Sequence, residues 1–379
     1  MRRYLAGLSV ASSLVLVTGC EGADPVTTTT SSSSTNSGGS GGGGGTGGAV
    51  TCSPDGAITP VESPSCAPLG TDYEPRDNGS ASDSWAACIS DDNQYHPFDP
   101  NISSSARTAA FEQIATLLAF GGDRAPTSQD FLEARVAYTV DQGIESRVSR
   151  REDEHYPPAP MACRDLGAAE QLQYPDRCVG PVKIQPIINQ AFQDGIEGKD
   201  PRGNAARIEA ALLWFFYVSV HKEARTCATT PADCDSSYAY YAGDKGRAEG
   251  FGLSRYVRSR SQDAHDRVWD GLLAVRCWRD LDNPTGPAAD AAMQDLATDQ
   301  LDRALLRGVG LIVRQRLAES ACAPAWITAQ ILGGVLDREA SGRDAAQAKV
   351  LRDELAKSDP GSVDVTAATA ALDALFPCP

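Results

Sequence analysis

The side chains best suited to chemistry gather between residues 221 and 266 of this 379-residue chain. Asp235 is followed closely by Tyr238, Tyr240 and Tyr241. Tyrosines beside a carboxylate can line a polar pocket, because each joins an apolar ring to a polar tip. On a helix, Asp235 and Tyr238 are i,i+3 neighbours, as are Tyr238 and Tyr241. The alternative is that all four are packing residues at the end of a helical bundle.

Two histidines flank this acidic and aromatic segment. His221 ends a long apolar run, where a polar residue meets solvent, and Glu223 points elsewhere on a helix. His265 lies between two acids, Asp263 and Asp266, which predicts that the pKa of its imidazole is raised and that it carries charge near neutrality. A solvated helix end and surface charge pairing are the respective alternatives. With Arg258, which comes earlier on the same predicted helix, the candidate pocket comprises Asp235, Tyr238, Tyr240, Tyr241, His221, Arg258 and His265.

No motif in the sequence identifies a catalytic residue or indicates a cofactor. The zinc-protease motif H-E-x-x-H and the phosphate loop G-x-x-x-x-G-K-[ST] are absent, and the nucleophile-elbow pattern G-x-S-x-G occurs only within a low-complexity Gly/Ser tract, at residues 38–42. The chain has four histidines, namely His96, His155, His221 and His265. We therefore expect no multi-histidine metal site, although carboxylates could supply the remaining ligands.

The elements that must position these residues are predicted to be helices. The strongest runs over 204–225 and is apolar on nearly every side between residues 210 and 220, which is typical of the central buried helix of a bundle. No apolar runs with a period of two residues indicate a sheet. Further helices are predicted near 111–118, after Thr127 or Ser128, and over 251–282, 288–320, 324–340, 343–357 and 364–376. The sequence therefore predicts an all-α multi-helix bundle over 104–379.

The first twenty residues are typical of an export signal. Arg2 and Arg3 precede a mostly apolar stretch that is too short to span a bilayer. The stretch ends in Val17-Thr18-Gly19-Cys20, which resembles the lipobox of bacterial lipoproteins and implies that Cys20 is lipidated. The alternative is an ordinary secretory signal with an incidental cysteine.

Two segments are predicted between this signal and the bundle. Residues 21–51 form a flexible tether, because Thr27–Gly48 contains only Thr, Ser, Gly and one Asn and has nothing to bury. Residues 52–103 are rich in Pro, Gly, Ser and Asp, and we expect them to form an irregular, disulfide-tied leader that packs on the bundle.

Ten cysteines remain after Cys20, an even number without metal-site spacing, which favours disulfides in an exported chain. Three pairs are close in the sequence and are predicted to bond: Cys52 with Cys66, Cys163 with Cys178, and Cys227 with Cys234. The sequence leaves open which of three ways pairs the other four, Cys88, Cys277, Cys322 and Cys378.

The charge of the chain limits its partners. A net charge of −16 argues against nucleic-acid binding and against adsorption to anionic membranes through a basic patch. We expect a monomer that is attached to a membrane of the bacterial cell envelope by its lipid, at the outer membrane or cell surface rather than the inner membrane. Its partner is expected to be an unknown ligand or envelope protein.

The segment from Asp235 to Gly243, the Arg-rich helix that follows and the helix around 305–317 resemble the imelysin-like helical-bundle lipoproteins of the envelope. The resemblance implies an all-α bundle with a pocket near Asp235. The family motif G-x-H-x-x-E is missing, since neither His221 nor His265 has Gly two positions before it and Glu three after it.

Two functions remain open at this point. The first is a non-enzymatic lipoprotein whose helical body binds a ligand or a protein. The second is an imelysin-like, metal-dependent hydrolase or metal-handling protein that uses Asp235, Glu209, His221 or His265. Stoichiometric metal in the purified protein would favour the second.

Overall fold

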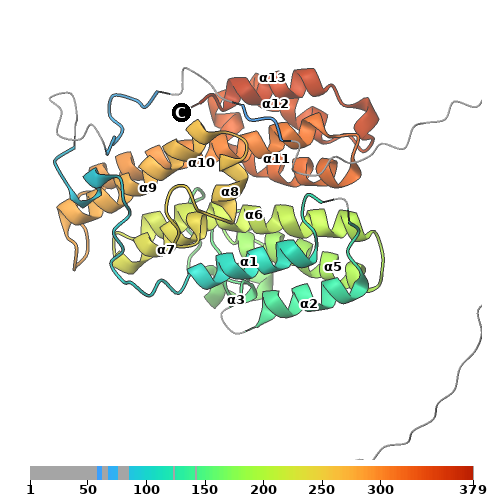
Figure 1. The fold of residues 1–379 in the computed structure, drawn as a ribbon, viewed down its shortest axis with the longest axis horizontal. Coiled ribbons are helices and arrows are strands. Elements are labelled where there is room, and N and C mark those ends of the chain that lie inside the picture. Colours follow the sequence, from blue (N-terminus) through green and yellow to red (C-terminus); the bar gives the residue numbers. More distant parts are fainter. Residues whose placement is uncertain (1–57, 62–66, 76–84, 123, 141–142, 379) are drawn as a thin grey trace, which may run out of the picture. The chain divides into compact units, whose positions relative to one another are not determined.

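Helices provide the regular structure of this chain. The computed structural model describes residues 58–61, 67–75, 85–122, 124–140 and 143–378. Within these ranges the chain forms thirteen α-helices and no strand (Figure 1). The predicted all-α, multi-helix fold is therefore confirmed.

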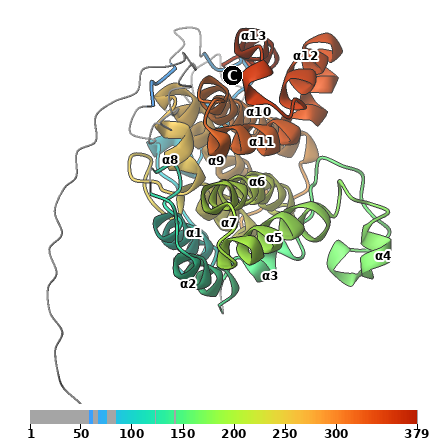
Figure 2. The same cartoon turned by 90° about the vertical axis from the view of Figure 1, so that its right-hand side faces the viewer.

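The longest apolar stretch of the sequence forms α6 (Pro201–Thr226), which lies in the middle of the bundle (Figures 1 and 2). Its first turn begins with Pro201, and the Asp200 side chain accepts a hydrogen bond from the backbone N–H of Gly203. Because its apolar side chains face several directions, the helix needs neighbours on several sides. These neighbours are α5 (Gln185–Ile196), α7 (Pro231–Ala242), α10 (Ala291–Ala318) and α11 (Ala323–Arg343).

Two groups of helices flank α6. The helices α1 (Ser105–Leu117), α2 (Ser128–Thr139) and α5 lie on one side, and α9 to α13 lie on the other (Figures 1 and 2). The remaining helices are α3 (Glu145–Val148), α4 (Ala168–Gln171), α8 (Leu253–Arg258), α9 (Gln262–Asp282), α12 (Ala345–Leu355) and α13 (Val365–Leu375).

The helix predicted over 251–282 is two helices in the structure. The first, α8, ends at Arg258, and α9 begins at Gln262. Ser261 lies at the break, where its side chain accepts a hydrogen bond from the backbone N–H of Ala264 and caps α9. The helix α5 was not predicted, although its buried residues are spaced as on one helical face.

Two close helix contacts depend on glycine. A Cβ atom on Gly271 of α9 would lie 2.6 Å from the Cα atom of Leu301 on α10, so these helices approach as closely as they do because a side chain is missing. Gly333 similarly faces Leu355 of α12, whereas Gly334 faces open space.

The leader contacts the helices through buried side chains. Its described part contains one short 3-10 turn, Ile89–Asp92. Tyr73 is fully buried, and its backbone N–H donates to the side-chain oxygen of Gln300 on α10 over 2.8 Å. Cys88 forms a disulfide with Cys277 of α9. The leader is therefore irregular and is tied to the bundle by a disulfide.

Two of the disulfides that were predicted from local spacing form in the structure. Cys163–Cys178 and Cys227–Cys234 have Cα atoms 5.5 and 5.0 Å apart. The predicted Cys52–Cys66 bridge lies outside the described residues. Cys322 and Cys378 are also disulfide-bonded.

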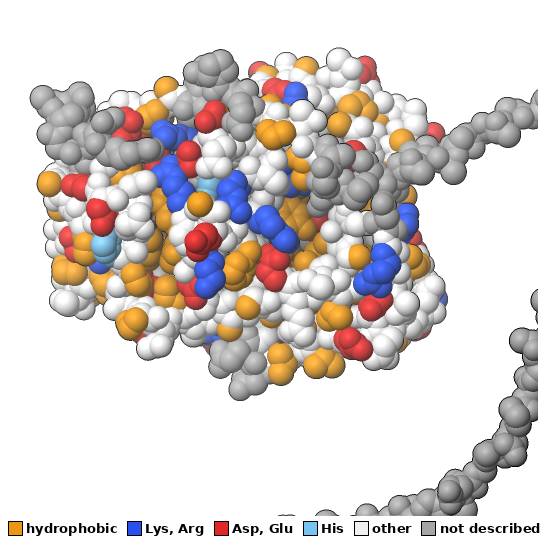
Figure 3. All heavy atoms as spheres, viewed as in Figure 1, with side chains coloured by type: hydrophobic (Ala, Val, Ile, Leu, Met, Phe, Trp, Pro, Cys, Tyr) orange, Lys and Arg blue, Asp and Glu red, His pale blue; other side chains and the backbone are white. Residues whose placement is uncertain are grey.

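The described residues all belong to a unit that spans Ala49–Pro379. Basic and acidic side chains lie between apolar ones on the face shown in Figure 3. Among the described helices, none combines the length and the hydropathy needed to cross a membrane. The predicted signal, Cys20 and the tether lie outside the described residues.

Candidate functional site

Two histidines and an aspartate from distant parts of the chain meet near the C-terminal end of α6. His155 lies in the loop after α3, His221 lies on α6 and Asp302 lies on α10. One potential ligand atom from each residue lies within 4.8 Å of the others. The fold thus brings two histidines that the sequence keeps far apart next to one carboxylate.

The imidazole of His155 is held from both sides. Its Nδ1 lies 2.6 Å from Asp153 Oδ1, and its Nε2 lies 3.1 Å from Asp302 Oδ1. The hydroxyl of Tyr217 donates to the same Asp302 oxygen over 3.2 Å. The ring of His221 stacks on His155 with 3.7 Å between centroids, and its buried Nδ1 has no hydrogen-bond partner among the described residues. His221 is 8% exposed, so it is not the solvated helix end that the sequence suggests.

The loop that carries His155 is fixed by an arginine and a disulfide. Arg177 donates through Nε to Glu152 over 2.9 Å and through Nη2 to Glu154 over 2.8 Å. The backbone N–H of Asp153 donates to the Arg177 carbonyl over 2.9 Å. The bridge Cys163–Cys178 joins the segment that follows the loop to the residue next to Arg177. These contacts fix the backbone of the loop that carries Asp153 and His155.

The electrostatics of the cluster differ between its members. Burial opposes charge on His155, but Asp302 and Asp153 outweigh burial and raise the pKa of this imidazole to about 9. Burial lowers the pKa of His221 to about 4, and the nearby charge of His155 acts in the same direction. Burial alone would raise the pKa of Asp302, but His155 holds it well below its usual range. Near neutrality an imidazolium therefore lies between two carboxylates, beside a neutral imidazole.

The cluster lies at the wall of an open cleft of about 440 Å³. Four arginines line the cleft, and each has a carboxylate partner at 3.2 Å or less. Asp299, one helical turn from Asp302, has no ion-pair partner among the described residues, and burial raises its pKa. The lining arginines are Arg225, Arg303, Arg338 and Arg343.

This set of side chains is suited to a transition-metal ion. Two imidazole nitrogens and one carboxylate form a donor set that zinc, iron and other first-row metals accept. A metal-bound histidine usually donates its other N–H to a carboxylate, and Asp153 already occupies that position against His155. The open cleft leaves room for a further ligand.

Asp235 holds the leader and does not line this cleft. Its carboxylate accepts hydrogen bonds from the Tyr95 hydroxyl and from the backbone N–H groups of Phe98 and Asp99, at 2.9 to 3.1 Å. The residue is 1% exposed. A buried carboxylate with three donors is already satisfied, so the predicted pocket role is corrected to a structural one.

The three candidate tyrosines are buried. Tyr238 stacks on Tyr95 with centroids 4.0 Å apart, and its hydroxyl donates to the Lys245 carbonyl. Tyr240 packs edge-on against Phe215. Tyr241 is fully buried and contacts His265. The alternative interpretation, packing residues of the bundle, describes these side chains.

His265 and Arg258 also make internal contacts. His265 Nδ1 lies 2.9 Å from the Tyr241 hydroxyl, and its Nε2 lies 2.8 Å from the Arg247 carbonyl. Burial lowers the pKa of His265 to about 4, which corrects the predicted raised pKa, because Asp266 is bound by Arg247 and leaves burial to dominate. Arg258 donates to the backbone carbonyls of Ala248 and Gly250. Of the seven predicted pocket residues, His221 lines the cleft described above.

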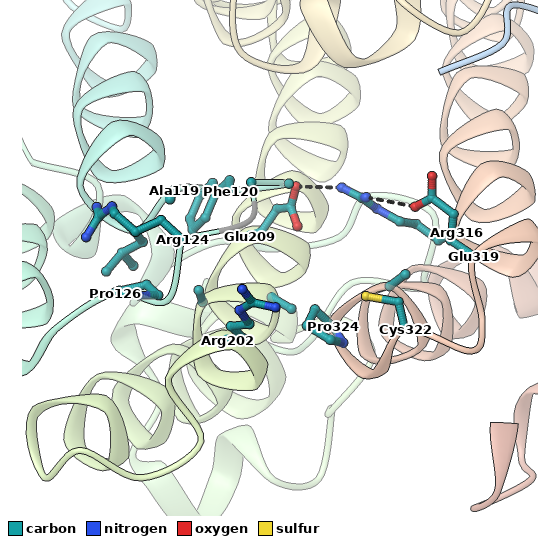
Figure 4. Close-up of a pocket in the computed structure, with 16 residues that line it drawn as sticks. Ala119, Phe120, Arg124, Pro126, Arg202, Glu209, Arg316, Glu319, Cys322 and Pro324 are labelled. Carbon is teal, nitrogen blue, oxygen red and sulfur yellow. Dashed lines mark hydrogen bonds and ion pairs between the residues drawn. The ribbon is translucent and has the colours of Figure 1, made fainter. Parts of the chain in front are cut away.

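Glu209 lies at a different cavity, shown in Figure 4. Its carboxylate accepts from the Tyr256 hydroxyl over 2.7 Å and pairs with Arg316 at 3.0 Å, and Arg316 also pairs with Glu319. The cavity holds about 40 Å³, which is room for little more than water. Glu209 therefore belongs to a buried ion-pair network and does not line the cleft that contains His221.

Sequence reasoning missed His155 and Asp302. The two residues come from a loop and from a helix, so no local motif joins them. One signal was present on α10, where Asp295, Asp299 and Asp302 follow helical spacing along a largely buried helix. Carboxylates on a largely buried helix need positively charged or hydrogen-bonding partners, and a histidine from elsewhere in the sequence is one such partner.

Comparisons of the chain with protein-family models, with curated proteins and with solved structures find no match. The resemblance to the imelysin-like lipoproteins stays a prediction. The functional argument consequently rests on the geometry of the site.

Proposed function

We propose that this chain is an exported, lipid-anchored envelope protein whose helical body binds a divalent transition-metal ion, with zinc as the reference metal, at His155, His221 and Asp302. The observation that carries the proposal is the convergence of the three potential ligand atoms within 4.8 Å, with Asp153 behind His155. A metal ion would replace the proton that His155 shares with Asp302, and would bind His221, whose Nδ1 has no hydrogen-bond partner among the described residues.

The test is zinc binding by the full chain, measured by competition with a chromophoric chelator and by metal analysis. We expect one zinc per chain, lost in His221→Ala and in Asp302→Asn. The matched control is His96→Ala, because His96 also pairs with an aspartate, Asp92, but lies at the surface. Absence of stoichiometric zinc, or equal zinc in wild type and His221→Ala, contradicts the proposal.

The lipid anchor has its own support and its own test. The basic start, the short apolar stretch and Val17-Thr18-Gly19-Cys20 have the order that a lipoprotein signal requires. We expect Cys20→Ser to move the protein from the membrane fraction to the soluble fraction, because stable attachment comes from the acyl chains. A Cys20→Ser protein that stays with membranes after a high-salt wash contradicts the anchor and leaves the metal proposal standing.

Metal-dependent hydrolysis is the second candidate function, and the open cleft beside the three ligands favours it. Catalytic zinc sites have three protein ligands and keep a fourth position for water. The measurement is hydrolysis of a chromogenic ester and of casein by the zinc-loaded protein. Turnover that needs zinc and disappears in His221→Ala supports hydrolysis, whereas zinc binding without turnover supports a binding role.

A further inference from the structure

A second pocket adjoins the metal cleft, and Glu154 lines both. It holds about 290 Å³ and lies between the α3 loop and the C-terminal turns of α6. Its lining is unusually basic for a chain whose net charge is −16. The basic residues that line it are Arg147, Arg150, Arg151, Arg164 and Lys222.

The carboxylates of this pocket are already engaged. Glu223 binds Arg151 at 2.7 Å and Lys222 at 3.4 Å. Glu152 and Glu154 are both held by Arg177, at 2.9 and 2.8 Å. Three acids are thus shared among several cations and cannot neutralise the remaining arginines.

Two arginines consequently lack counter-charges. Among the described residues, the side chains of Arg147 and Arg150 have no carboxylate within ion-pair distance and donate no hydrogen bond. The Nε atoms of Arg147 and of Arg151 are buried without a hydrogen-bond partner, and Arg151 is 4% exposed. A buried N–H group without an acceptor is costly, so a ligand that accepts from these Nε atoms would be stabilised.

The electrostatic potential around these arginines is also positive. Burial lowers the pKa of Arg150, and the positive charges of Arg147, Arg164 and Arg151 lower it further. Burial likewise lowers the pKa of Arg107, and Arg147 and Arg151 add to the effect. These arginines repel one another in the absence of an anion, and an anion between them would relieve the repulsion.

We infer that this pocket binds a small polyanion, a molecule with two or more phosphate or carboxylate groups, through Arg147, Arg150 and Arg151. Planar guanidinium groups bind both kinds of anion through paired hydrogen bonds. A volume of about 290 Å³ exceeds that of one such group and suits a compact molecule with several. The inference goes beyond the proposed metal site and does not depend on it.

The test is isothermal titration calorimetry of the full chain in dilute buffer, with pyrophosphate and with citrate as probes. The protein is first treated with EDTA, so that no metal ion can recruit the anion. We expect saturable binding of at least one probe at one site per chain, and affinity that falls as salt is added. Binding of pyrophosphate alone identifies a phosphate ligand, binding of citrate alone identifies a carboxylate ligand, and both results support the inference.

The variants separate the pocket from general charge. Arg147→Ala and Arg150→Ala should each weaken binding by about tenfold or more, because each removes a charged donor. Arg150→Lys keeps the charge without the paired donors and should bind with intermediate affinity, and its melting temperature checks the fold. The control Arg352→Ala removes the same charge from an exposed site on α12, where Arg352 pairs with Asp337, and should bind as wild type does.

Two results overturn the inference. One is the lack of saturable heat with both probes. The other is equal affinity in wild type, Arg147→Ala and Arg150→Ala. Either result is independent of zinc binding, which is measured on the same preparations before EDTA treatment, so failure here is distinct from failure of the metal site.

Discussion

His155 Nε2 lies 3.1 Å from Asp302 Oδ1, although one residue belongs to a disulfide-tied loop and the other to the buried helix α10. This contact is part of a series of polar contacts in which Asp153 binds His155, His155 binds Asp302, and the Tyr217 hydroxyl donates to Asp302. The ring of His221 stacks on His155, and its Nδ1 atom has no hydrogen-bond partner within the described part of the structure. The proposed metal site therefore needs little rearrangement of its supporting residues.

Asp153 should control metal affinity without being a ligand. Asp153→Asn keeps an oxygen near His155 Nδ1 but removes the negative charge that strengthens and orients the imidazole. We expect zinc affinity to fall by about tenfold or more in a chelator competition. The control is Asp165→Asn, since Asp165 is an exposed acid near Arg164. Equal affinities for wild type and Asp153→Asn would contradict a supporting role.

His265 should make the fold sensitive to acid. Burial holds its pKa at about 4 in the folded protein, below the value of 6.5 in an unfolded chain. The unfolded state therefore binds a proton first as the pH falls, so stability is full above pH 6.5 and declines from there down to pH 4. The slope from one proton is about 1.4 kcal/mol per pH unit.

The measurement is urea unfolding at several pH values, with the NMR shifts of the His265 ring as a direct check. His265→Gln keeps a donor for the Arg247 carbonyl and removes the titration, so its slope over this range should be smaller by one proton. Asp266, Arg247 and Arg258 are the charged groups near the ring. Protonation of His265 in the folded protein above pH 6 would refute the prediction.

The α6 core should respond unequally to truncation of its aromatic residues. Phe216 is fully buried against Phe111 and Tyr240, whereas Trp214 is only half-buried. Phe216→Ala should lower the free energy of unfolding by about 3–5 kcal/mol, because it opens a cavity in a packed core. Trp214→Ala should cost less. Urea midpoints measure both, and an unchanged midpoint for Phe216→Ala would show that α6 is not central.

Local signals in the sequence were sufficient for the fold class. The apolar run of α6 and the spacing of residues such as Phe111 and Ile114 specify helices through contacts three and four residues apart. The break between α8 and α9 was missed because the apolar pattern continues across it. Ser261 caps α9 by accepting a hydrogen bond from the backbone N–H of Ala264. The sequence alone does not show which serine has such a partner.

The site could not be found in the same way. The sequence placed Asp235 and its neighbouring tyrosines in a pocket, since these residue types can line one. In the fold the Asp235 carboxylate accepts hydrogen bonds from the backbone N–H groups of Phe98 and Asp99. No sequence pattern near residue 235 predicts these hydrogen bonds. The meeting of His155 with Asp302 likewise depends on which loop crosses which helix.

The disulfides Cys88–Cys277 and Cys163–Cys178 should have different effects on stability and on zinc binding. Cys88–Cys277 joins the leader to α9 across 189 residues, so the double variant Cys88→Ser with Cys277→Ser should lose about 2–4 kcal/mol of stability. Limited proteolysis should then cleave the leader sooner, while zinc affinity stays as in wild type.

The bridge Cys163–Cys178 should behave in the opposite way, because it closes a short loop next to the segment that carries His155. Loss of this bridge loosens the arrangement in which Arg177 holds Glu152 and Glu154, and a looser His155 binds metal less well. We expect Cys163→Ser with Cys178→Ser to weaken zinc binding and to leave the leader as resistant to protease as before. If the leader variant were the one that lost zinc, the site would depend on contacts of the leader, and the assignment of His155 positioning to this loop would be wrong.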